Sequence, residues 1–93
     1  MQFKNNSAIY RNDNLVFEDS ESVKGKCCEV KEYLTYELAS QCMSMKRGYE
    51  EIVYNGRLIL DLINELEENN VNDDLIIIVK FNPMGSLYYE VVA

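Results

Sequence analysis

The clearest hydrophobic pattern lies in the last third of the chain. Residues Leu75–Phe81 form a run of mostly branched aliphatic side chains, and β-branched residues favour strands over helices. Asn82-Pro83-Met84-Gly85 then combines residue types that favour turns, and Ser86–Val92 is expected to return as a second strand. This segment therefore predicts a β-hairpin.

Residues 26–46 show a helical period instead. Hydrophobic side chains recur there at intervals of three and four, which places them on one helical face. They are Cys27, Val30, Leu34, Leu38, Cys42 and Met45. Lys46 and Arg47 fall in the expected last turn, where cations suit the helix dipole, and Gly48 is the expected C-terminal stop.

Residues 49–69 allow two interpretations. Asn55-Gly56 lies between two apolar runs, which is a common signal for a tight hairpin that would span residues 49–62. Leucines at every fourth position and several glutamates favour a helix instead. We favour a helix over residues 56–69 with Asn55 as its N-cap, and the hairpin is the alternative.

Short extended segments are expected near the N-terminal end. Ser7–Arg11 and Leu15–Glu18 flank Asn12-Asp13-Asn14, which has the chemistry of a turn, so a second β-hairpin is expected there. Residues 19–25 are polar and end at Gly25, which predicts a loop.

The order of these elements indicates the fold class. Two strands, two helices and two strands predict an α+β fold, in which an antiparallel sheet carries two helices packed on one face. The 93 residues suffice for one domain, residues 1–93. The strand at 75–81 is apolar on both faces, although one face of a two-layer sheet usually meets water. The first helix, the N-terminal segment or a second copy in a homodimer is expected to cover the second face.

The residues that most catalytic and metal sites require are scarce. The chain has no histidine, no CxxC pair, no P-loop and no EF-hand loop. The sequence therefore predicts no enzymatic activity, no metal and no cofactor. Cys27 and Cys42 are expected in the core, whereas Cys28 points elsewhere and leaves a redox function as an alternative.

The cysteines and the apolar runs also suggest a compartment. Three cysteines cannot form a complete disulfide set within one chain, which fits a reducing cytoplasm. The sequence shows no signal peptide and no apolar stretch long enough to span a membrane, so no membrane association is expected.

Charge is the other strong signal. Sixteen acidic and nine basic residues give a net charge of −7. Nucleic-acid binding needs cations that displace condensed counterions, so DNA, RNA and anionic lipid are expected to repel this chain. Basic proteins are expected to attract it. The acids concentrate between residues 50 and 74, where Arg57 is the only cation.

Seven acids form the predicted partner-binding set: Glu50, Glu51, Asp61, Glu65, Glu68, Asp73 and Asp74. Asp61, Glu65 and Glu68 are spaced by four and three, so they share one helical stripe and rise by about 4.5–6 Å per step. Phosphates of one DNA strand advance by about 3.4 Å per step, so the stripe can present a phosphate-like row to a basic groove. An ordinary solvated helix face is the alternative interpretation.

Two resemblances bear on function. Residues Gly56–Leu66 followed by Asp73–Ile78 resemble a helix-to-strand unit of small phage proteins. In size, acidity and its Asn-, Ile-, Lys- and Tyr-rich composition, the chain resembles small acidic early proteins of large phages, such as the DNA-mimicking anti-restriction proteins of T-even phages. This resemblance implies inhibition through a basic DNA-binding surface and assigns no role to single residues.

The sequence thus favours a phage-encoded, non-enzymatic inhibitor that acts in the host cytoplasm. Its acidic surface is expected to bind the basic surface of a DNA-binding or nuclease-type protein. The alternative is an adaptor or assembly protein that binds through the apolar face of the strand at 75–81 or through exposed Tyr88 and Tyr89.

Overall fold

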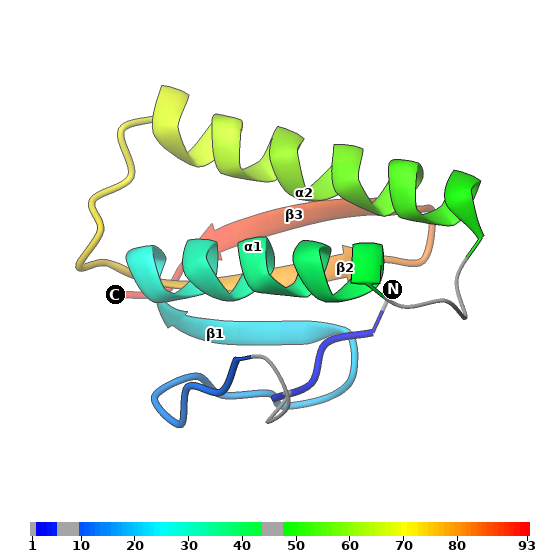
Figure 1. Ribbon diagram of the computed structural model, residues 1–93. Coiled ribbons are helices and arrows are strands. Elements are labelled where there is room, and N and C mark those ends of the chain that lie inside the picture. Colours follow the sequence, from blue (N-terminus) through cyan, green and yellow to red (C-terminus); the bar gives the residue numbers. More distant parts are fainter. Residues whose placement is uncertain (1, 6–9, 44–47) are drawn as a thin grey trace.

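Two helices lie side by side on one face of a three-stranded antiparallel sheet (Figure 1). The computed structural model describes residues 2–5, 10–43 and 48–93. Its elements, in chain order, are β1 (Ser22–Lys26), α1 (Cys27–Met43), α2 (Tyr49–Glu68), β2 (Ile76–Asn82) and β3 (Ser86–Val91). The α+β class and the antiparallel sheet expected from the sequence are confirmed.

The sheet has the order β1-β2-β3, with β2 in the centre. Val79 of β2 pairs with Val23 on one side and with Tyr89 on the other. Directly paired residues point to the same face of a sheet, so this row faces the helices. Val23 and Val79 are fully buried there.

The loop expected over residues 19–25 was wrong in its second half, because Ser22–Lys26 forms β1. A central strand needs hydrogen-bonding partners on both edges, and β1 supplies the second edge for β2. Gly25 serves close packing and does not end a loop. A Cβ added there would lie 2.6 Å from Cδ2 of Leu15.

The N-terminal hairpin was also wrong in the part that the structure describes; residues 7–9 lie outside it. The turn at Asn12 is present, since the Leu15 amide donates to the Asn12 carbonyl at 3.2 Å. Val16, however, forms an isolated bridge with Lys24 of β1. Tyr10 instead stacks on Tyr36 of α1, with ring centroids 4.7 Å apart. Packing on α1 therefore replaces the expected strand pairing.

The first helix was predicted well at its start. Cys27, Val30 and Leu34 are fully buried. Cys42, expected in the core, is exposed, and Gln41 is buried in its place. Each step of four residues overshoots a helical turn of 3.6 residues, so repeated steps of four carry the pattern away from the core.

The end of that helix and the start of the next also differ from the prediction. Met45, Lys46 and Arg47 lie outside the described residues. Gly48 has φ −71° and is the N-cap of α2, so it is no left-handed C-terminal stop.

Asn55-Gly56 is neither a turn nor a helix start, because α2 runs from Tyr49 to Glu68. The hairpin alternative is therefore wrong. Asn55 is buried, and its Nδ2 donates to Oε1 of Gln41 on α1 at 3.0 Å. A Cβ added to Gly56 would lie 3.2 Å from Cδ1 of Leu38, so glycine lets the two helices approach closely.

The C-terminal hairpin is confirmed. The Gly85 amide donates to the Asn82 carbonyl at 2.8 Å, and Gly85 adopts φ +94°, a conformation that favours glycine. The hydroxyl of Tyr54 donates to the Gly85 carbonyl, which ties the first half of α2 to this turn.

Candidate functional sites

The outer face of α2 gathers the largest part of the predicted acidic set. Ile59, Leu62 and Leu66 point into the core. By helical periodicity, four acids share the opposite side: Glu50, Asp61, Glu65 and Glu68. All four are exposed. They are called the α2 stripe below.

The stripe extends along most of the helix. The distance from Glu50 to Glu68 is about 27 Å at a rise of 1.5 Å per residue. Within residues 2–5, 10–43 and 48–93, Asp61, Glu65 and Glu68 make no ion pair. Their charges therefore face solvent along one side of the molecule.

The helix predicted from the sequence began at residue 56 and left Glu50 and Glu51 outside it. In the structure, both acids occupy the first turn of α2. Carboxylates in the first turn interact favourably with the positive end of the helix dipole. Gly48 offers no side chain to cap this end. These two acids therefore also have a structural explanation, which Asp61, Glu65 and Glu68 lack.

Asp73 and Asp74 lie in the connection between α2 and β2, apart from the stripe. An oxygen of Asp73 is 3.0 Å from Nζ of Lys31 on α1. This hydrogen bond raises the pKa of Lys31 above its ordinary value, against a smaller opposing effect of burial. Asp73 thus joins α1 to the α2–β2 connection, although both Asp73 and Asp74 are exposed.

The face of the sheet that points away from the helices is mixed in character. Ile78 lies between Lys24 and Glu90 in the register of the three strands. Its side chain is 8% exposed, although it lies on the outer face. Tyr88 is exposed, but Tyr89 packs against the core and accepts a hydrogen bond from Nδ2 of Asn69 at 2.8 Å.

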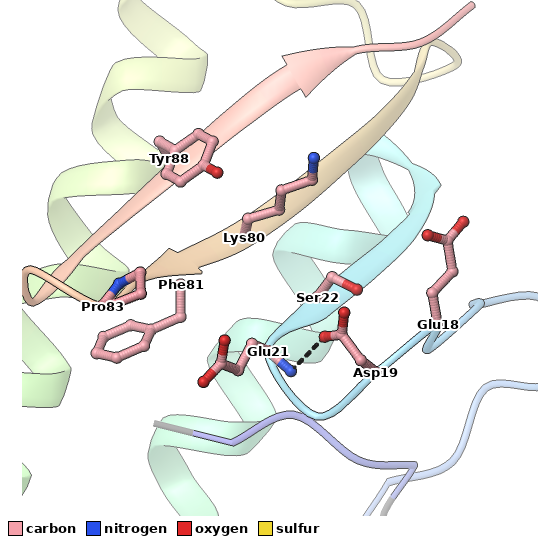
Figure 2. A pocket seen from close by; sticks show the side chains of 8 residues that line it. All are labelled: Glu18, Asp19, Glu21, Ser22, Lys80, Phe81, Pro83 and Tyr88. Carbon is pink, nitrogen blue, oxygen red and sulfur yellow. Dashed lines mark hydrogen bonds between the residues drawn. The ribbon is translucent and has the colours of Figure 1, made fainter.

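A second acidic group lines a hollow of about 310 Å³ at one end of this outer face (Figure 2). Its wall consists of Glu18, Asp19, Glu21, Ser22, Lys80, Phe81, Pro83 and Tyr88. The carboxylates come from the turn before β1, whereas Lys80 and Tyr88 project from β2 and β3 (Figure 2). We call this hollow the β1 pocket.

Ser22 distinguishes the β1 pocket from an ordinary group of surface acids. It is 4% exposed, and its Oγ has no hydrogen-bond partner among the described residues. Ser22 pairs with Lys80, so both side chains point to the outer face. Buried hydroxyl groups are nearly always hydrogen-bonded, so this one requires an explanation.

The sequence pointed to Tyr88 and to the strand at 75–81 only as a surface for the adaptor alternative, and it did not predict that they share a pocket with Ser22 and the acids before it. A strand at Ser22–Lys26 would have placed Ser22 beside Lys80 and brought the acids before it to the edge of the sheet. The alternation of Val23 and Gly25 with polar residues was the available signal. Two lysines and a glycine within five residues concealed it.

In the described part of the chain, no group of three or more histidine, cysteine, aspartate and glutamate residues could hold a metal ion. None of the helices described is both long and apolar enough to cross a membrane.

The three cysteines differ in how far they are buried. Cys27 is buried, which raises the pKa of its thiol, and Cys28 is half-buried. Cys42 is exposed. All three are free thiols.

Comparisons of the chain with protein-family models, with curated proteins and with solved structures found no match. Function is therefore inferred from the chain's own surfaces.

Proposed function

We propose that this protein is a non-enzymatic inhibitor that binds the basic surface of a DNA-binding or nuclease-type protein. The α2 stripe is its binding surface, and its carboxylates take the place of DNA phosphates. We infer that it is a phage-encoded counter-defence protein that acts in the host cytoplasm, and its 93 residues and net charge of −7 are compatible with that function.

The observation that carries the proposal is the exposed row of carboxylates at Asp61, Glu65 and Glu68. Like charges one turn apart destabilise a helix by a few tenths of a kcal/mol per pair. Glu68 also lies at the C-terminal end of α2, where the dipole disfavours anions. Helix stability therefore does not explain these acids, whereas attraction to a basic groove does.

The net charge of −7 supports the same proposal. Long-range attraction between an acidic protein and a basic cleft accelerates their encounter and fixes orientation. Such binding weakens steeply as salt is added, because exposed charges are screened within about 8–10 Å at moderate ionic strength.

The experiment is a pull-down from bacterial lysate with the tagged protein, eluted with increasing salt and analysed by mass spectrometry. DNA-binding proteins are expected to elute at moderate salt, and added duplex DNA should compete for them. Partners that survive high salt and ignore DNA would overturn the proposal and favour the adaptor alternative.

Matched variants locate the surface. Glu65→Lys and Glu32→Lys change the net charge equally, but Glu65 lies on the α2 stripe and Glu32 is exposed on α1. Glu65→Lys should elute at clearly lower salt, and the triple reversal of Asp61, Glu65 and Glu68 to Lys should abolish capture. Equal losses for the two single variants would show that only net charge matters.

A further inference from the structure

We propose that the β1 pocket binds the guanidinium group of an arginine side chain on a partner protein. The pocket lies on the face of the sheet that points away from the helices. The inference is therefore independent of the function proposed for the α2 stripe, and either can fail alone.

The charges of the pocket select a cation. Glu18, Asp19 and Glu21 contribute three carboxylates, and Lys80 contributes the only ammonium among the lining residues. Lys80 is not a close partner of these acids, since the carboxylate with which it forms an ion pair is that of Glu90, at 4.0 Å. A positively charged guest would offset the excess of negative charge.

Ser22 indicates that the pocket is built to hold a donor. Its buried Oγ has no partner in the part of the chain that the structure describes, which is costly unless a ligand supplies one. An N–H group that enters between the carboxylates can donate to this oxygen. Ser22 lines the pocket and lies on the same outer face as Lys80.

The shape of the pocket favours guanidinium over ammonium. Tyr88 adds a flat, partly apolar surface on the outer face, and Pro83 borders the pocket at the turn after β2 (Figure 2). A planar guanidinium group packs against such surfaces and presents five donors in one plane. Carboxylates on separate residues can each accept a hydrogen bond from one of these donors. An ammonium group instead acts as a compact, strongly hydrated point charge.

The pocket is also large enough for this guest. Its volume of about 310 Å³ is near the lower end of the range for small-molecule sites. A divalent cation fits less well, since no acidic group in the described residues could hold a metal ion. A guanidinium group therefore fits the pocket better than a metal ion does.

The first test is an NMR titration of the ¹⁵N-labelled protein with N-acetyl-arginine amide. We expect saturable shifts at residues 18–22 and 80–88. N-acetyl-citrulline amide has nearly the same shape without the charge, and we expect it to cause no saturable shift. The lysine analogue should bind about tenfold more weakly. Equal binding of the arginine and citrulline compounds would overturn the proposal.

Two variants test the residues. Glu21→Gln should weaken binding of the arginine compound about tenfold, since it removes a charge-assisted hydrogen bond. Glu32→Gln removes the same charge from α1 and should leave affinity unchanged. Unchanged affinity in Glu21→Gln would refute the proposal.

Ser22→Ala separates binding from structure. It removes a buried hydroxyl without a partner, so the midpoint of thermal unfolding should stay the same or rise, while affinity falls. A residue with a purely structural role would leave affinity unaltered, and that result would count against a donor bound at Ser22.

Discussion

The two helices have similar lengths but different surroundings. α1 is covered by the sheet, by α2 and by the N-terminal segment, whose Phe3, Tyr10 and Phe17 lie against Tyr33. α2 contacts the core along one side only, and its other side carries the acidic stripe. Packing therefore restricts the residues of α1 on most sides, whereas the outer half of α2 can change its charge without disturbing the core.

The largest expected loss of stability follows from a substitution at Tyr33, which is buried between α1 and the N-terminal segment. Tyr33→Ala should lower the free energy of unfolding by about 3–5 kcal/mol, because it empties a site that is 2% exposed. Leu60→Ala, on the outer part of α2 where the side chain is 54% exposed, should cost no more than about 0.5 kcal/mol. Urea denaturation followed by circular dichroism measures both. Similar losses would contradict the comparison.

The contact between the two helices should show an intermediate effect. Asn55→Ala leaves Oε1 of buried Gln41 without its donor and should cost about 1–3 kcal/mol. The double variant Gln41→Met, Asn55→Leu removes both polar groups, and it should recover most of the loss. Thermal and urea unfolding of the three proteins test this pair. A double variant as unstable as the single one would show that shape, and not hydrogen bonding, dominates there.

Alkaline pH should lower the free energy of unfolding through Tyr33 of α1. Burial, and then the nearby charge of Glu37, raise the pKa of Tyr33 above its ordinary value of 10.0. Above pH 10 the unfolded chain therefore loses this proton while the folded protein keeps it. The free energy of unfolding should fall by about 1.4 kcal/mol per pH unit from this group.

Tyr33→Phe is the control for that titration. It also loses the hydrogen bonds to the Lys4 backbone, so it should begin about 1 kcal/mol less stable at neutral pH. Above pH 10 its stability should decline less steeply than that of the parent. Parallel declines would show that Tyr33 does not cause the alkaline loss.

The smallest expected effect is on the α2 stripe. Asp61→Asn, Glu65→Gln and Glu68→Gln together should raise the free energy of unfolding by a few tenths of a kcal/mol at low salt, because like-charged neighbours are removed. The gain should vanish in about 1 M salt, where the screening length is about 3 Å. Loss of stability in this variant would mean that the stripe has a structural role.

Much of the fold was predictable where side-chain pattern and turn chemistry agreed. Strand β2, the turn at Gly85 and the start of α1 at Cys27 followed from local sequence. Strand β1 did not, because Ser22–Lys26 is a strand only through its long-range pairing with β2. The Asn55-Gly56 pair misled for a similar reason, since Gln41 and Leu38 of the other helix determine its role.

The two candidate sites differ in the same way, since one depends on local sequence and the other on long-range pairing. The α2 stripe could be read from spacing alone, since Asp61, Glu65 and Glu68 belong to one helix. The β1 pocket could not, because only the pairing of β1 and β3 with β2 brings Ser22 and Tyr88 to the same face of the sheet.

The central position of β2 also determines how the chain can fold. Its pairing with β3 closes a short turn, whereas its pairing with β1 joins strands that both helices separate in the sequence. Contacts between distant residues form more slowly than local ones. We therefore expect the C-terminal hairpin to be an early template and the first strand to dock late. For the same reason, we expect β1 and the N-terminal segment before it to separate from the rest of the fold first when the protein begins to unfold.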